Sequence, residues 1–199
     1  MCRSCRSQLR VLAPPRCARC GAPTVWPVER CRECAGRRLA FASARAAVVY
    51  AGPARSLVHG WKEHGLRRAA GLAAELVVAH VERSAADVIA YIPPDPARQL
   101  QRGHHPAERL ARELGRRWSL EVSELLVRTR PAVRQTGLDR AARRTNVRDA
   151  FVSTTRVPAT VLLVDDVYTT GATVGATATA LRSAGAAYVH VVTFARTVR

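Results

Sequence analysis

The chain has 199 residues and a formal net charge of +17, from 32 Lys and Arg against 15 Asp and Glu. This length suits one α/β domain with a small appendage, and no apolar run approaches the roughly 20 residues of a membrane helix. The Cys- and Arg-rich start argues against a secretory signal, which needs an apolar stretch. We therefore expect a cytoplasmic protein with no membrane span. Its charge favours polyanionic partners, the alternative being a basic surface with no dedicated partner.

All six cysteines lie within the first 40 residues, as the pairs Cys2/Cys5, Cys17/Cys20 and Cys31/Cys34. Cytoplasmic thiols stay reduced, so we interpret the pairs as metal ligands, and two pairs complete a tetrahedral structural Zn²⁺ site. Gly21 follows Cys20 and suits a tight turn, which favours Cys17, Cys20, Cys31 and Cys34 as the site. Cys2 and Cys5 then lack partners unless a further pair precedes them, so the choice among the six stays open. Residues 1–40 are predicted to form a zinc-ribbon module that docks partners or nucleic acid.

Residues 41–199 show strand and helix patterns in alternation. A helix should begin at Gly52-Pro53 and end before Gly65, and the prolines Pro93 and Pro94 should end the strand before them. The strands are expected at 46–50, 87–92, 120–127, from Val161 onward and at 188–195, with helices near 53–64, 67–77, 105–117 and up to about 184. Such alternation predicts an α/β domain with a parallel sheet flanked by helices.

The segment from Val161 to Thr173 carries the clearest chemistry. Its first four residues are aliphatic, as in a buried parallel strand, and Asp165 and Asp166 follow them, so both carboxylates should lie at the carboxyl edge of the sheet. A turn rich in hydroxyl groups then leads into an Ala-rich helix whose first N–H groups can bind an anion; it comprises Thr169, Thr170, Gly171, Ala172 and Thr173. Carboxylates accept hydrogen bonds from vicinal hydroxyls, so a ribose 5-phosphate would match both parts. The alternative is that the acids hold Mg²⁺ or cap a helix.

This segment resembles the phosphoribosyl-pyrophosphate loop of type I phosphoribosyltransferases. The resemblance implies that Asp165 and Asp166 bind the ribose hydroxyls while residues 169–173 surround the 5-phosphate. It also implies a type I phosphoribosyltransferase-like fold for residues 41–199.

Further motifs extend the resemblance over nearly the whole chain, to the ComF-type competence-associated phosphoribosyltransferase-like family. They are the Cys pairs, Tyr50-x-Gly-Pro, Lys62 with Gly65, Ile92-Pro-Pro, Arg98, Arg102-Gly103, Arg128-x-Arg130, Gln135, Leu138, Arg143, Asn146 and Phe194-Ala-Arg196. The resemblance implies a link to competence and DNA uptake. Two departures stand out: Arg102-Gly-His-His-Pro106 replaces the family's usual Arg-Gly-Phe-Asn-Gln, and a further upstream Cys pair is absent.

Transfer from phosphoribosyl pyrophosphate develops negative charge on the leaving pyrophosphate, so the reaction requires Mg²⁺ and positioned cations. Lys62, Arg98 and Arg102 are the candidate cations, although any of them could be an ordinary surface charge. His104 and His105 are adjacent on a predicted helix and point in different directions, so we interpret both as solvated.

Two functions of different classes fit these patterns. The first and favoured one is a Mg²⁺-dependent phosphoribosyltransferase with an unknown acceptor. The second is a non-catalytic accessory of DNA uptake that binds single-stranded DNA and senses phosphoribosyl pyrophosphate. Partners would then be single-stranded DNA or other DNA-uptake proteins.

The stretch from Arg128 to Arg148 combines seven arginines with a single acid, Asp139. Like charge at this density disfavours a packed loop, and Pro131 and Gly137 interrupt regular structure. We expect a mobile lid over the ligand site, the alternative being a solvated basic helix over 138–148.

Overall fold

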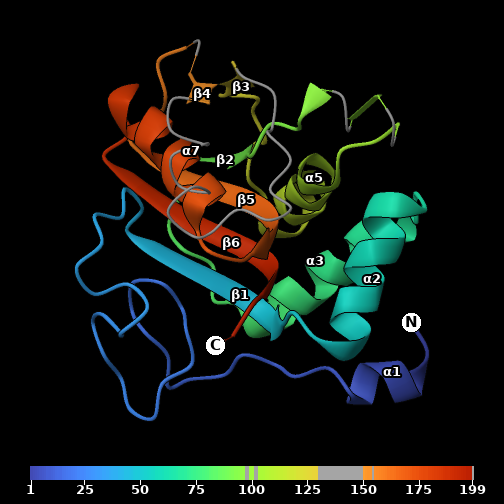
Figure 1. The fold of residues 1–199 in the computed structure, drawn as a ribbon. Coiled ribbons are helices and arrows are strands. Elements are labelled where there is room, and N and C mark those ends of the chain that lie inside the picture. The colour runs from blue at the N-terminus through green and yellow to red at the C-terminus, as the bar shows by residue number, and fades with distance from the viewer. Residues whose placement is uncertain (97–98, 101–102, 130–149, 154, 199) are drawn as a thin grey trace.

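The computed structural model describes residues 1–96, 99–100, 103–129, 150–153 and 155–198. Figure 1 shows their arrangement, a central sheet with helices on both sides. The strands are β1 (Ser43–Val49), β2 (Val88–Tyr91), β3 (Val127–Arg128), β4 (Phe151–Val152), β5 (Thr160–Tyr168) and β6 (Tyr188–Arg196), and the helices are α1 (Arg3–Ser7), α2 (Gly52–Glu63), α3 (Arg68–His80), α5 (Pro106–Trp118) and α7 (Ala172–Ser183).

Four of these strands form the main sheet of the described chain, in the order β1-β6-β5-β2 with every pair parallel. In the register, Val164 of β5 lies opposite Tyr91 of β2 and Val192 of β6. The strands are rich in Val, Leu, Ile and Ala, as expected when both faces of a parallel sheet are covered. The predicted α/β class with a parallel sheet between helices is confirmed.

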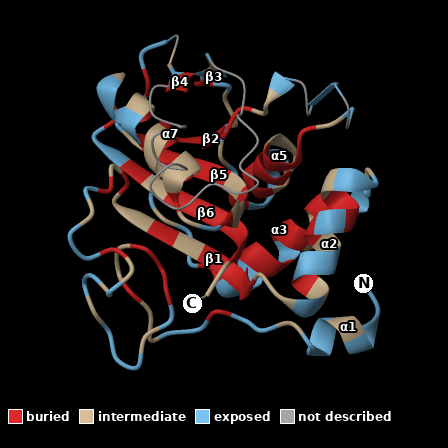
Figure 2. Cartoon of the chain, in the orientation of Figure 1, coloured by how far each residue is buried: buried red, intermediate tan, exposed pale blue. Residues whose placement is uncertain are grey.

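Two buried clusters separate the faces of the sheet. Helices α2, α3 and α5 cover one face and pack residues such as Trp61 and Leu110 against it. Helix α7 covers the other face together with the cysteine-rich segment, so that Leu181 and Cys17 belong to the same cluster. Figure 2 shows the resulting pattern, with buried strands and exposed outer helix faces. None of the described helices has the length and apolar character that crossing a membrane requires.

Local chemistry explains where these elements begin and end. Helix α2 has a proline in its first turn, where the missing N–H has no helical partner, and Gly65 beyond its end adopts a φ of +62°. Gly185, with a φ of +109°, follows the end of α7 as predicted. These left-handed conformations suit glycine, which has no Cβ to clash.

Two expectations about strands are corrected. Strand β5 does not end before the acids but continues through them to Tyr168, because β6 stays paired with it up to that residue. The segment 120–127 is not a continuous strand: Val122 bridges to Ile89, and only Val127 and Arg128 form β3, paired with β4.

Candidate functional site

The two acids of β5 lie at the point in the sheet where the helices that follow two adjacent strands cover opposite faces. Strand β2 leads to α5 on one face, whereas its neighbour β5 leads to α7 on the opposite face. Open α/β sheets bind ligands in the crevice outside the carboxyl ends of such a pair of strands. Asp165 and Asp166 are near the carboxyl end of β5, and Ile92 directly follows β2.

A cavity of about 370 Å³ opens at this point. Residues from β5, from the segment after β2, from α2 and from α5 line it, as do two residues of the turn before α7. The lining comprises Tyr50, Lys62, Ile92, Pro93, Pro94, Asp95, Gln99, His104, His105, Pro106, Ala107, Arg128, Asp165, Asp166, Val167, Thr169 and Thr173. The acid pair, Lys62 and two residues of the hydroxyl-rich turn, Thr169 and Thr173, therefore meet at one cavity. Gly171 and Ala172 of the same turn line a different groove.

Lys62 approaches the acids from the last turn of α2. Its Nζ lies 2.6 Å from Oδ2 of Asp166, which is 7% exposed. Asp165 instead accepts a hydrogen bond at Oδ1 from the backbone N–H of Asp166, at 2.8 Å. Burial and the neighbouring charge of Asp166 raise the pKa of Asp165 to about 7, against the opposing effect of Lys62. The pair therefore holds one carboxylate neutralised by a cation and one that titrates near neutrality.

The turn between β5 and α7 has the geometry of a helix start. Gly171 precedes the helix with a φ of +72°, and the N–H of Ala172 donates to Oγ1 of Thr170 at 3.2 Å. A Cβ on Gly171 would lie 2.3 Å from the Tyr168 hydroxyl, so a larger residue cannot occupy this position without displacing the ring. Thr169 and Thr173 face the acid-lined cavity from this turn. The arrangement can bind an anion through backbone N–H groups and hydroxyls.

The histidines differ from the solvated pair expected from sequence. His105 is buried, with its ring 5.3 Å from that of Tyr91, and burial lowers its pKa. His104 donates from Nε2 to the carbonyl of Trp61 at 2.7 Å. Both line the cavity, because the helix that they precede starts beside β2 rather than in solvent.

The arginines near the predicted site differ in whether the structure describes them. Arg98 and Arg102 lie outside the described residues, as does 130–149, which holds most of the expected lid. Arg128 was not predicted as a site residue, yet it lines the cavity from β3. Its place in the Arg128-x-Arg130 motif was the signal that could have identified it.

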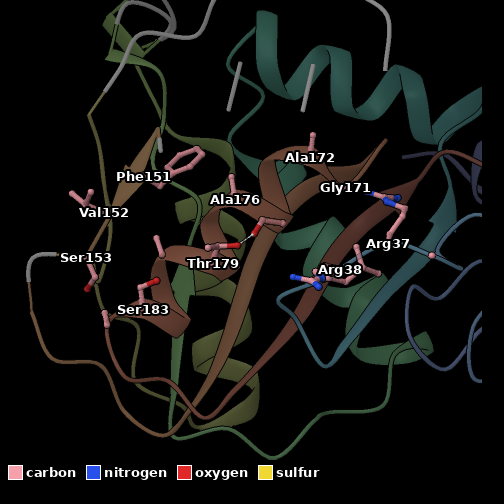
Figure 3. Close-up of a pocket in the computed structure, with 15 residues that line it drawn as sticks. Arg37, Arg38, Phe151, Val152, Ser153, Gly171, Ala172, Ala176, Thr179 and Ser183 are labelled. Atoms are coloured by element: carbon pink, nitrogen blue, oxygen red, sulfur yellow. Dashed lines mark hydrogen bonds between the residues drawn. The ribbon is translucent and has the colours of Figure 1, made fainter. Parts of the chain in front are cut away.

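A larger groove of about 920 Å³ lies on the other side of the same turn. Figure 3 shows it between Arg37 and Arg38 of the cysteine-rich segment, the small residues of α7 and the segment from Phe151 to Ser153. The described residues that line it include no acid and neither carboxylate of the pair, so it does not replace the smaller cavity as the candidate site for a ribose phosphate.

Four of the six cysteines come together in the described structure, namely Cys17, Cys20, Cys31 and Cys34. All four Sγ atoms lie within 4.8 Å of one another, and three of the pairs are separated by 3.4, 3.6 and 4.0 Å. A tetrahedral zinc site with Zn–S bonds of 2.3 Å has sulfurs about 3.8 Å apart, so the cluster fits such an ion. Cys2 and Cys5 lie in and beside α1, outside this group.

The backbone around the cluster also suits a metal. Burial would raise the pKa of Cys17, but N–H groups of Cys20 and Cys31 point at its sulfur, 3.5 and 3.3 Å away, and the pKa falls to about 7. Because zinc binds the thiolate, these donors favour the ligating form. Gly21 makes the tight turn with a φ of +69°, and a Cβ there would lie 2.3 Å from the carbonyl oxygen of Ala44.

Comparison with known proteins identifies the relatives of this chain. It is 30% identical to DNA utilization protein YhgH of Escherichia coli O6:H1, over 92% of this chain and 84% of the relative. It is 26% identical to competence protein F of Haemophilus influenzae, over 98% of this chain and 90% of the relative. The chain belongs to the ComF-type family. No protein-family model matches it.

Two solved structures resemble this ComF-type protein weakly. The Bacillus subtilis glutamine phosphoribosylpyrophosphate amidotransferase, complexed with ADP and GMP, has a TM-score of 0.41 and 24% identity, covering 64% of this chain and 26% of the amidotransferase. TT1426 from Thermus thermophilus has a TM-score of 0.34 and 21% identity, covering 64% of this chain and 72% of TT1426.

Proposed function

We propose that this protein binds phosphoribosyl pyrophosphate at the cavity of β5 and transfers its phosphoribosyl group to an acceptor. The observation that carries the proposal is that Asp165, Asp166, Lys62 and the turn residues Thr169 and Thr173 adjoin one cavity at the carboxyl edge of the sheet. The carboxylates accept hydrogen bonds from the ribose hydroxyls, and the turn binds the 5-phosphate. Residues 41–199 form the catalytic domain and residues 1–40 a zinc-ribbon module.

In this reaction the acceptor forms a bond to C1 of the ribose while the C1–O bond to pyrophosphate breaks, and pyrophosphate leaves with the bonding electrons. The developing negative charge requires cations, and Lys62 is placed beside the acids to supply one. Mg²⁺ suits this cavity, since carboxylates of Asp95, Asp165 and Asp166 line it and the ion binds through carboxylate and phosphate oxygens. When bound, the ion would neutralise charge on the leaving pyrophosphate.

The cellular setting that we propose follows from the relatives. One is named for competence and the other for DNA utilization, so we assign the protein to the handling of DNA during uptake in the cytoplasm. A second candidate function fits the same setting: a non-catalytic accessory that binds single-stranded DNA and senses phosphoribosyl pyrophosphate. The net charge of +17 favours a nucleic-acid partner in either case.

The first test is ligand binding by the double variant Asp165→Ala with Asp166→Ala. Calorimetry with Mg²⁺ should detect binding of phosphoribosyl pyrophosphate to the wild-type protein and none to the variant. Each lost hydrogen bond to a charged group costs about 1.5–3 kcal/mol, or roughly tenfold to a hundredfold in affinity. Glu124→Ala, which removes an exposed acid outside the cavity, is the matched control. Equal affinity in the double variant would refute the assignment.

Turnover separates the two candidate functions. The protein is incubated with phosphoribosyl pyrophosphate, Mg²⁺ and a panel of bases and oligonucleotides, and released pyrophosphate is measured. Release that depends on one acceptor class identifies an enzyme and its acceptor. Binding without release across the panel favours the accessory.

A further inference from the structure

The side chain of Arg37 joins the cysteine-rich segment to the turn that precedes α7. Its Nη2 donates to the carbonyl oxygen of Thr170 at 3.1 Å. The same guanidinium donates from Nη1 to the carbonyl of Glu33 at 3.4 Å, and the N–H of Arg37 donates to the carbonyl of Cys34. Figure 3 shows Arg37 beside Gly171, at one end of the larger groove. Arg37 thus joins the last cysteine of the cluster to the turn.

This contact fixes the orientation of a peptide group in the turn. The peptide bond between Thr170 and Gly171 is trans and planar, so its C=O and N–H point in opposite directions. With the carbonyl held by Arg37, the N–H of Gly171 is directed away from the cysteine-rich segment. If this peptide group rotated, the carbonyl of Thr170 would take the place of the N–H of Gly171 in the turn. Phosphate would then meet an acceptor instead of a donor, and a carbonyl oxygen repels phosphate.

A second set of contacts, through Arg196 and Tyr168, links the cysteine-rich segment to the same turn. Arg196, at the end of β6, is 1% exposed and donates to the carbonyl of Cys20 at 2.5 Å, while its Nη2 lies 3.0 Å from Oε2 of Glu33. Its guanidinium also lies 5.2 Å from the ring centroid of Tyr168. The Tyr168 hydroxyl is buried against Gly171 and has no hydrogen-bond partner among the described residues. The cysteine-rich segment therefore contacts the turn both directly and through a buried stack.

We propose that Arg37 is a positioning residue for the phosphate-binding turn, and that the four-cysteine module acts as the rigid base from which it works. This inference deepens the proposed function and rests on it. It predicts that a residue outside the acid-lined cavity controls affinity for the 5-phosphate end of the ligand. Arg37 does not line that cavity, so its effect is indirect.

The test compares Arg37→Ala with Arg38→Ala by calorimetry. The ligands are ribose 5-phosphate, Mg²⁺ with inorganic pyrophosphate, and Mg²⁺ with phosphoribosyl pyrophosphate. Arg38 is the exposed neighbour, and its loss removes the same charge from the same segment. Arg37→Ala should weaken ribose 5-phosphate and phosphoribosyl pyrophosphate about tenfold, the effect of one charge-assisted hydrogen bond. Pyrophosphate binding and zinc content should match those of the wild-type protein.

The outcomes distinguish this inference from the function on which it rests. If the wild-type protein binds no phosphoribosyl ligand, the proposed function fails and the inference fails with it. If the wild-type protein and Arg37→Ala bind ribose 5-phosphate equally, or if Arg38→Ala causes the same loss, the inference alone is overturned. Should Arg37→Ala not fold, Arg37→Met keeps most of the side-chain length and removes every donor. Its affinity for ribose 5-phosphate should drop while its pyrophosphate affinity stays at the wild-type level, and no drop would contradict the positioning role.

Discussion

At the scale of single residues, Asp165 and Asp166 show how neighbouring carboxylates acquire different properties. Both carboxylates line the same cavity, but their nearest partners differ. Asp166 meets the ammonium group of Lys62, whereas Asp165 has a neighbouring backbone N–H and an adjacent like charge. An enzyme gains from such a pair because one group can stay ionised while the other changes protonation near neutral pH.

We predict that Asp165→Asn changes how stability depends on pH. Folding raises the pKa of Asp165 to about 7, from an ordinary value near 4 in the unfolded chain. The folded state therefore binds this proton more tightly than the unfolded chain does. The stabilisation that results is lost as pH rises through the folded pKa. Relative to the variant, the wild-type protein should lose on the order of 2 kcal/mol of unfolding free energy between pH 5 and pH 8.

Urea unfolding of both proteins at constant zinc concentration measures this difference. Glu124→Gln serves as the control, because that carboxyl group is exposed and should leave the pH profile unchanged. Parallel profiles for the wild-type protein and Asp165→Asn would show that folding does not raise this pKa.

The sequence predicted those site residues whose signal is local. The acids and the hydroxyl-rich turn are contiguous, so strand pattern and helix start located them together. The ion pair between Lys62 and Asp166 joins distant segments, and only the sheet order brings α2 to β5. The burial of His105 could not be predicted either, since it depends on the position of Tyr91 in another element.

At the scale of elements, the cysteine-rich segment has few regular structures of its own and depends on other contacts for its order. We predict one tightly held Zn²⁺ per chain, bound by Cys17, Cys20, Cys31 and Cys34, whose sulfurs already lie at tetrahedral spacing. Cys17→Ser should lose the metal and lower the melting temperature, because metal binding contributes directly to folding.

Elemental analysis of protein purified without added zinc tests this prediction. Cys2→Ser is the matched control, as Cys2 lies outside the cluster, and it should retain the ion. Protein that contains no zinc, or a Cys17→Ser variant that keeps its full content, would contradict the assignment.

The accuracy of the element predictions follows the strength of their periodic patterns. The helices near 53–64 and 105–117 were found within one or two residues as α2 and α5, because each presents a clear apolar face. The antiparallel pair of β3 and β4 was missed, since two-residue strands carry no periodic signal. Helix α1 was also missed; it is five residues long with no buried residue.

At the scale of the whole molecule, the two faces of the sheet contribute different parts of the site. Helix α2 and the start of α5 supply one wall of the cavity with Lys62 and the histidines, whereas the turn before α7 approaches from the opposite face. The cysteine-rich segment packs against that second face. This layering follows from right-handed crossovers in a parallel sheet, and it explains why the site lies at the carboxyl edge between β2 and β5.

The net charge of +17 leads to the last prediction, which is salt-sensitive binding of single-stranded DNA. Each phosphate contact made by an arginine releases counterions, so the logarithm of the affinity falls with that of the salt concentration, by about 0.7 per contact on a single strand. Three contacts would weaken binding roughly twentyfold between 50 and 200 mM salt.

Fluorescence anisotropy with a labelled oligothymidine, across a salt series, measures the slope. The series is repeated with saturating phosphoribosyl pyrophosphate and Mg²⁺, because a sensor must change its DNA affinity when the ligand binds, and linkage makes this coupling reciprocal. A changed affinity supports the accessory function, whereas an unchanged affinity together with pyrophosphate release supports the enzyme. Binding that does not depend on salt, or no binding at low salt, would remove DNA from the list of partners that the charge predicts.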